Sequence, residues 1–269
     1  MRKILTTLFC ISSIFACSSS YDPQPENPSI LRFKDARGST TSGGNLIDHG
    51  GKILPVNNTY SIFWGNQNAF PSDAKSGLDS LFNGLNGSSF LNISSQYMRG
   101  ATSSTTFHTN WIDLSSPPTH SPSVSTIGNE VCTIIGQNNA TPDTNGIYFV
   151  YTSNFPHLNF CAFHSWSICN GVDIQIAYLP NVSGVAGCNP GDLYGCNTYS
   201  EGTRALANVS SHEFMEAVTD PEISSWYNAS GSEIGDICAW QFSSCVQLST
   251  GSFQLQKEWD NQTSSCIQQ

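Results

Sequence analysis

The sequence is poor in charged residues, and in basic residues most of all. Charged side chains make up only 11% of the 269 residues, and 20 acids against 10 lysines and arginines give a formal net charge of −10. No basic patch is present, which excludes nucleic acids and anionic lipid surfaces as expected partners. From residue 205 to residue 256 there is no lysine or arginine at all. Carboxylates in that interval therefore have no basic neighbour in sequence to balance their charge.

The motifs of several common chemistries are also absent. The chain has no phosphate-binding loop, no dinucleotide-binding fingerprint and no Gly-x-Ser-x-Gly nucleophile elbow. Near the N-terminus, the apolar run from Ile4 to Ala16 follows two basic residues and is too short to span a membrane stably. We interpret residues 1–17 as a signal peptide, and the segment ending at Cys17 resembles a bacterial lipobox. A membrane tether is expected only through a lipidated Cys17.

Cysteine, in contrast, is abundant. The chain has ten cysteines, and loss of Cys10 with the signal peptide plus lipidation of Cys17, or cleavage beyond it, leaves eight. An even set of eight predicts four disulfides and an oxidising location, either secreted or in the periplasm or on the outer surface. Short loops close at the lowest entropic cost, which favours the pairs Cys161–Cys169 and Cys188–Cys196.

Composition divides the mature chain into two parts. Residues 18–48 are rich in Ser, Pro, Gly and Thr and have few large apolar side chains, which is typical of a flexible tether. Residues 49–269 are long enough for one well-buried domain. We expect this domain to be a monomer.

Hydrophobic patterns in the domain alternate between strand and helix periods. Strands are predicted at 60–64, 103–114, 147–151, 172–178 and 253–259, and helices at 71–85, 124–135 and around His212. The run 147–151 is apolar throughout, so it is expected to be a central strand buried on both faces. The pattern predicts a single mixed-sheet domain of the α/β or α+β class with flanking helices.

One stretch, Ser211 to Pro221, carries most of the candidate chemistry. On a helix, His212 and Glu216 lie one turn and about 40° apart, and Glu213 and Asp220 fall within about 100° of His212. The same flank carries Ala205 and Val209, which indicates that it faces a cleft or core. A divalent cation is the simplest counter-charge for this helix; the alternative is a solvated acidic helix with one satisfied histidine.

The spacing matches a zinc site with an open position. Zinc hydrolases use three protein ligands and a carboxylate that takes a proton from water. We assign His212 and Glu216 as ligands and Glu213 as the catalytic base. Three residues remain as candidates for the third ligand: His164, Asp236 and Glu233.

Each candidate for the third ligand also has a structural interpretation. His164 lies between Cys161 and Cys169, where a disulfide would pin its loop, but it is also a single histidine among aromatic residues. Asp236 and Glu233 follow the helix by a short loop, and either is equally suited to capping a turn. The remaining histidines are interpreted as surface or loop residues: His49, His108, His120 and His157.

Two resemblances follow from these motifs. The His212-Glu213-x-x-Glu216 segment resembles the zincin helix His-Glu-x-x-His, with Glu216 in place of the second histidine. From about residue 50 to the C-terminus, the chain resembles the exordium/phosphate-induced protein family and its bacterial relatives. The segments that carry this resemblance are Phe160–Ser165, Ser210–Glu213 with Thr219–Pro221, Trp226-Tyr227, Glu233–Cys238, and Gln256–Trp259 with Cys266.

The resemblance implies an extracellular, disulfide-stabilised, exordium-like domain with a zincin-like active-site helix. In its C-terminal part, it implies a Cys238–Cys266 disulfide, which leaves Cys132 to pair with Cys245.

Three functions are compatible with the sequence. The first is a secreted or surface-tethered zinc-dependent hydrolase, most simply a metallopeptidase, that acts on a peptide or a cell-surface polymer. The second is a non-enzymatic extracellular exordium-like protein of the cell wall or surface with a structural or vestigial metal site. The third replaces zinc with calcium, because carboxylates outnumber histidines here. In all three, the anionic Glu216 lowers the positive charge at the metal, so bound water is less acidified.

Overall fold

The structure is a computed structural model that describes residues 28–32 and 44–269. The predicted signal peptide, Cys17 and most of the predicted tether lie outside these residues. Among the helices of the described residues, none combines the length and the apolar character that a membrane span requires.

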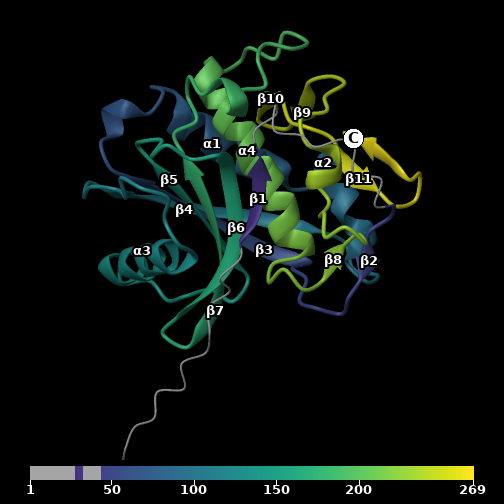
Figure 1. Cartoon of the computed structure of the whole chain (residues 1–269), viewed down its shortest axis with the longest axis horizontal. Coiled ribbons are helices and arrows are strands. Elements are labelled where there is room, and N and C mark those ends of the chain that lie inside the picture. Colours follow the sequence, from purple (N-terminus) through teal and green to yellow (C-terminus); the bar gives the residue numbers. More distant parts are fainter. Residues whose placement is uncertain (1–27, 33–43) are drawn as a thin grey trace, which may run out of the picture.

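A mixed six-stranded sheet forms the centre of the domain, as the interleaved strand and helix patterns predict. In order across the sheet, the strands are β1 (Ser29–Arg32), β6 (Phe160–Cys169), β7 (Val172–Pro180), β5 (Gly146–Thr152), β3 (Val56–Trp64) and β4 (Ser104–Asp113) (Figure 1). From β7 to β4 the neighbouring strands are parallel, whereas β6 is antiparallel to β7 and β1 is antiparallel to β6.

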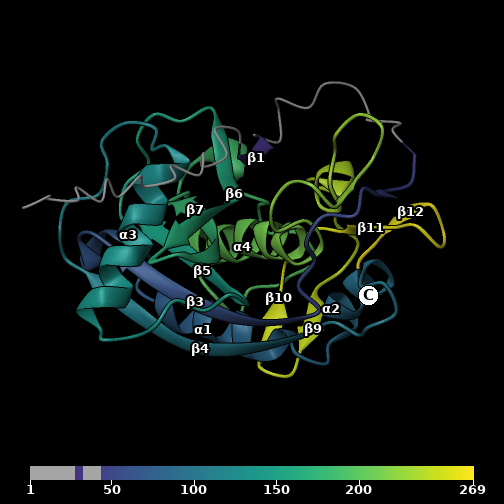
Figure 2. The same ribbon diagram turned by 90° about the horizontal axis from the view of Figure 1, so that it is seen from below.

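Helices cover both faces of the sheet (Figures 1 and 2). The side chains of β5 alternate between two hydrophobic cores. Ile147, Phe149 and Tyr151 join the core that contains α1 (Ala74–Leu85) and α4 (Glu201–Thr219). Tyr148 and Val150 join the core that contains α3 (Val124–Gln137). All residues of β5 are buried, which confirms the predicted central strand.

Short elements complete the fold. They are η2 (Gln67–Ala69), α2 (Ser89–Asn92), η3 (Ile93–Tyr97), η4 (Ala186–Cys188), η5 (Asp236–Cys238), and the strand pairs β2 (Ile47–Asp48) with β8 (Trp226–Tyr227), β9 (Val246–Leu248) with β10 (Gly251–Phe253), and β11 (Glu258–Asp260) with β12 (Ser265–Ile267).

The predicted strand over 253–259 is wrong, because β10 ends at Phe253 and β11 begins only at Glu258. Between these two strands, the backbone N–H groups donate to a side chain and to a loop carbonyl instead of to a neighbouring strand. The N–H of Gln256 donates to the side chain of Asn208, and that of Lys257 donates to the carbonyl of Gln241.

Helix α4 runs through the core. It begins after Ser200, whose hydroxyl accepts the N–H of Thr203, and it ends before Pro221, which has no N–H to continue it. Every residue from Ala205 to Thr219 is buried. The polar side chains of this helix therefore find their partners inside the protein, which explains why the helix organises the candidate site.

Strand β6 corrects the expectation that His164 lies in a loop pinned by a disulfide. The segment Phe160–Cys169 is an extended strand, and its two cysteines lie at opposite ends. At about 3.3 Å per residue, eight residues separate the cysteine Cα atoms by about 26 Å, well beyond the reach of a disulfide. His164 is thus held by the ladder with β7, where it pairs with Ala177.

Four disulfides are present, as the set of eight cysteines predicts, but most of the predicted pairing is wrong. The observed pairs are Cys132–Cys169, Cys161–Cys188, Cys196–Cys245 and Cys238–Cys266, and only the last was expected. The preference for short loops fails because tertiary placement brings residues from different elements together: α3 contacts β6, and η4 contacts the same strand. Four disulfides fit a secreted protein that folds in an oxidising compartment.

Part of the segment expected to be a tether is ordered against the domain. Ser29–Arg32 form β1, which pairs with the outer edge of β6, and Leu31 is fully buried. At the far end of the same segment, β2 pairs with β8.

Candidate metal centre

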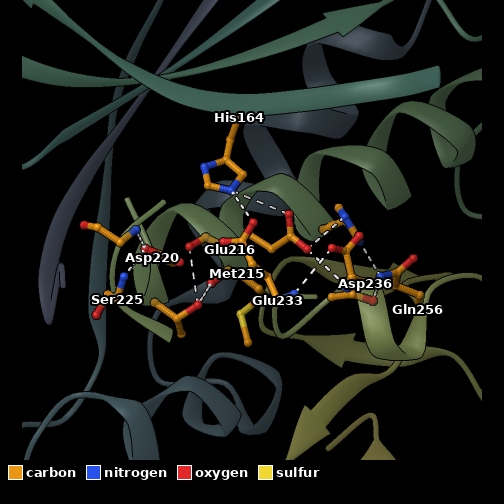
Figure 3. A network of polar contacts seen from close by, with 12 residues as sticks. His164, Met215, Glu216, Asp220, Ser225, Glu233, Asp236 and Gln256 are labelled. Atoms are coloured by element: carbon orange, nitrogen blue, oxygen red, sulfur yellow. Dashed lines mark hydrogen bonds and ion pairs between the residues drawn. The ribbon is translucent and has the colours of Figure 1, made fainter. Parts of the chain in front are cut away.

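Three elements bring the predicted site residues together. Strand β6 supplies His164, α4 supplies His212 and Glu216, and the segment around η5 supplies Glu233 and Asp236. Figure 3 shows the His164 ring pointing from its strand toward the carboxylates of Glu216 and Glu233. All five proposed ligands therefore lie in one region of the molecule.

The first ligand group consists of His212, Glu216 and Asp236. One ligand atom from each lies within 4.8 Å of the others. The Nε2 atom of His212 is 3.1 Å from Oε1 of Glu216, but the contact lacks hydrogen-bond geometry. Two ligands of a tetrahedral zinc lie about 3.3 Å apart when each bond is about 2.0–2.1 Å. The pair is thus spaced as two ligands of one ion are.

The second ligand group consists of His164, Glu216 and Glu233. The Nε2 atom of His164 lies 3.3 Å from Oε2 of Glu233 and 3.6 Å from Oε2 of Glu216. All three side chains are buried. Glu216 therefore belongs to both groups, with Oε1 facing His212 and Oε2 facing His164.

The two groups differ in their access to solvent. In the first group, His212 and Glu216 are fully buried, whereas Asp236 is partly exposed. Catalytic zinc sites keep one coordination position open, and structural sites are closed. Of the two groups, only the one that includes Asp236 has a member that is partly exposed.

Histidines are the only basic side chains that contact these carboxylates among the described residues. In the described part of the chain, Glu216 and Glu233 lie within ion-pair distance of His164 or His212, and neither pairs with a lysine or arginine. Buried acceptors are left over: Oε2 of Glu216, Oε1 of Glu233 and both oxygens of Glu213 have no hydrogen-bond donor. Unpaired buried carboxylates are costly, so the donor set fits a cation.

The electrostatics of the site follow from this burial. Burial raises the pKa values of Glu213 and Glu216 well above the usual carboxyl range, and the charges of Asp236 and Glu233 raise them further. Burial, together with the charge of His164, lowers the pKa of His212 to about 3. The His212 ring is therefore neutral at neutral pH, as a metal ligand must be.

His164 behaves differently. Burial by itself lowers the pKa of His164, but the charge and hydrogen bond of Glu233 outweigh burial, and the pKa is raised. The shift favours the charged form of the ring relative to an ordinary histidine, and a charged ring would offset part of the negative charge of Glu216 and Glu233.

Glu213 lies beside the ligand groups without belonging to either. Its side chain is fully buried and close enough to Asp236 and Glu233 for their charges to raise its pKa. A carboxylate that is adjacent to a metal site but outside the ligand set is suited to proton transfer.

A second layer of contacts fixes His212. The side-chain amide nitrogen of Gln256 lies 2.6 Å from Nδ1 of His212 and donates to the carbonyl of Gly235 at 3.1 Å. The N–H of Asp236 donates to Oε1 of Glu216 at 3.1 Å. Gly235 itself leaves no room for a side chain, because a Cβ atom there would lie 2.6 Å from Nδ1 of His212.

Asp220 has a separate role, although it shares a flank of α4 with His212. Its Oδ1 atom accepts the N–H groups of Ser224 and Ser225, both at 2.6 Å, so it anchors the chain that leaves the helix. Burial and the charge of Glu233 raise its pKa to about 7, although these hydrogen bonds oppose the shift.

The remaining histidines lie at the surface, as expected: His49, His108, His120 and His157 are exposed. His49 stacks on Tyr227 with ring centroids 3.7 Å apart.

Two buried residues of the site were missed by the sequence analysis. Gln256 carries no charge, and the strand pattern predicted over 253–259 rests on other residues and does not single it out. Glu258 is fully buried, and burial followed by the charge of Asp236 raises its pKa well above the usual range. The only signal for either residue was their place in a segment that resembles the exordium family.

Comparison with known proteins adds no assignment: no protein-family model matches the chain, and no curated protein is similar enough to match. The resemblance to the exordium family and to the zincin helix therefore stays a prediction.

Proposed function

We propose that this protein is an extracytoplasmic zinc-dependent hydrolase, most simply a peptidase. One observation supports it most: His212, Glu216 and Asp236 converge on one point in the protein, with Glu213 next to them and outside the ligand set. This is the combination of three ligands and a free carboxylate that zinc hydrolases use.

Asp236 is the third ligand in this proposal. It belongs to the same group as His212 and Glu216, and it is the one partly exposed member of that group. Zinc is preferred to calcium because calcium takes six to eight oxygen ligands, whereas this group offers one nitrogen and two carboxylates.

Zinc and Glu213 have separate roles in the proposed reaction. When bound, zinc supplies Lewis acidity that polarises a carbonyl and lowers the pKa of a water molecule. Glu213 accepts one proton of the attacking water on its carboxylate. The water oxygen forms a bond to the carbonyl carbon, the C–N bond breaks, and Glu213 returns the proton to the leaving nitrogen. A cation beside Glu213 also favours the ionised form that accepts the proton.

His164 and Glu233 support this group from the other side. His164 contacts the second oxygen of Glu216 and is itself held by Glu233, so the pair fixes the orientation of a carboxylate that also faces His212. Partners of this kind orient a ligand, and their loss typically lowers metal affinity by about 10–100-fold.

A non-enzymatic surface protein is the second candidate, and burial favours it. His164, His212, Glu213 and Glu216 are all completely inaccessible to solvent in the intact chain. A metal held there without access to substrate would only stabilise the fold.

Elemental analysis of the mature protein, combined with hydrolysis of a peptide library, separates the two candidates. We expect one zinc per chain, and we expect His212→Ala and Asp236→Ala each to lose both zinc and hydrolysis. The matched control is Glu130→Gln, a buried carboxylate on α3 on the opposite face of the sheet. Zinc without hydrolysis in any form of the chain would favour the non-enzymatic protein, and a zinc-free protein would refute the metal site.

A further inference from the structure

Strand β1 lies at the edge of the sheet that is closest to the candidate metal centre. It pairs antiparallel with β6, and Ser29 is opposite His164 while Leu31 is opposite Ala162. In Figure 1 the short β1 runs between β6 and α4, and β1 contacts both elements. Four residues of the N-terminal segment thus lie over the helix that carries His212, Glu213 and Glu216.

The contacts of β1 include the proposed base. The backbone N–H of Leu31 approaches the carboxyl of Glu213, although neither oxygen of Glu213 completes a hydrogen bond. The Leu31 side chain is fully buried in the core that contains α4, and Ile30 packs against the opposite core. Because neighbouring side chains alternate between two hydrophobic cores, β1 has the features of an extended peptide held by strand addition.

The attachment of β1 depends on few contacts. It is four residues long, its only sheet partner among the described residues is β6, and Leu31 is the one fully buried side chain among Ser29, Ile30 and Leu31. Without β1, the outer edge of β6 presents unpaired backbone N–H and C=O groups, which are a template for another strand. The covalent link to the domain gives β1 a high effective concentration at this edge. A segment held in this way is exchangeable for another extended chain.

We infer that the outer edge of β6 beside Glu213 is a binding site for an extended polypeptide, and that residues 29–32 occupy it in the intact chain. Release of these residues then exposes Glu213 and admits a peptide substrate with a leucine-like side chain at the position of Leu31. The intact chain is a latent form. This inference rests on the proposed function for its catalytic consequence, whereas the binding site itself rests on the pairing of β1 with β6.

The test removes β1 from its edge in the full-length chain. Leu31→Asp places a charge in the buried core, and Leu114→Asp is the matched control at a side chain that is 77% exposed. Loss of one buried leucine corresponds to about a ten- to hundredfold shift toward the released state. We expect Leu31→Asp to raise amide hydrogen exchange in Phe160–Ser165 and to raise peptide hydrolysis by a similar factor, and we expect Leu114→Asp to change neither.

A synthetic peptide with the sequence of residues 28–34 provides the second readout. It should restore exchange protection to β6 in Leu31→Asp and inhibit hydrolysis, whereas a scrambled peptide of the same composition should do neither. If Leu31→Asp fails to fold, a protease recognition sequence within residues 33–43 allows β1 to be released after folding, since the four disulfides join only residues from Cys132 onward.

The outcomes distinguish the two proposals. Unchanged exchange at β6 after release, or equal protection by the native and scrambled peptides, would overturn the strand-binding site. If the intact and the cut chain hydrolyse peptides at equal rates, the proposal that the intact chain is latent is wrong, whereas the proposed hydrolase function still holds. Specific peptide binding without hydrolysis in any form would support the binding site and refute the proposed enzyme.

Discussion

Gly235→Ala adds one methyl group directly against the proposed zinc ligand. The new Cβ atom would lie 2.6 Å from Nδ1 and 2.8 Å from Cε1 of His212, and 3.1 Å from Oε1 of Glu216. Ordinary contact begins at 3.4 Å, so the imidazole has to move by about 0.8 Å (3.4 Å less 2.6 Å). The backbone of Gly235 has φ −79° and ψ −38°, which alanine adopts without strain. The substitution therefore acts on the side chains of the site and leaves the backbone as it is.

Displacement of about 1 Å at a catalytic group costs about 10²-fold in rate, and we expect a loss of this size for Gly235→Ala. The assay is thermal unfolding with and without added zinc, together with peptide hydrolysis. In the parent chain zinc should raise the melting temperature, and in Gly235→Ala this increase should largely disappear. Gly136→Ala on α3 is the control, because nothing lies within 4 Å of its added methyl group. Normal zinc stabilisation of Gly235→Ala would show that His212 does not bind the metal from its observed position.

Two further predictions concern buried polar residues. Gln256→Leu removes the contact at Nδ1 of His212 and should weaken zinc binding by about 10–100-fold in a chelator titration, whereas Gln254→Leu, equally buried, should not. Burial, with the hydrogen bond and charge of Asp113, raises the pKa of Glu130 to about 8. Between pH 4.5 and 8 the folded state therefore keeps a proton that the unfolded state has lost, and stability falls as the pH rises, by about 1.36 kcal/mol per pKa unit of difference. Glu130→Gln should flatten this fall in urea-unfolding midpoints measured from pH 5 to pH 8, and an unchanged slope would assign the pH dependence to other groups.

The sequence predicted those parts of the structure that depend on local pattern. The central strand 147–151 and the helix around His212 were predicted because an apolar run and a helical spacing are properties of neighbouring residues. The failures arise where partners are distant in sequence. His164 was assigned to a loop because its flanking cysteines were paired with each other, whereas β6 is extended and each cysteine pairs with another element.

The third ligand could not be chosen from the sequence for the same reason. Asp236, Glu233 and His164 all reach the α4 carboxylates, and only the folded chain shows that they form two groups that share Glu216. The buried position of Gln256 depends on a long-range contact with His212, so its type and spacing gave no signal.

The central claim is tested most directly by the zinc content and hydrolysis rate of Glu213→Gln, measured in both the intact and the cut chain. Glutamine keeps the shape of the side chain but cannot accept a proton. Zinc should stay at one per chain, while hydrolysis should fall by about 10²–10⁴-fold relative to the parent in the same form. Hydrolysis at the parental rate with zinc bound would contradict the assignment of Glu213 as the base and, with it, the proposed enzyme.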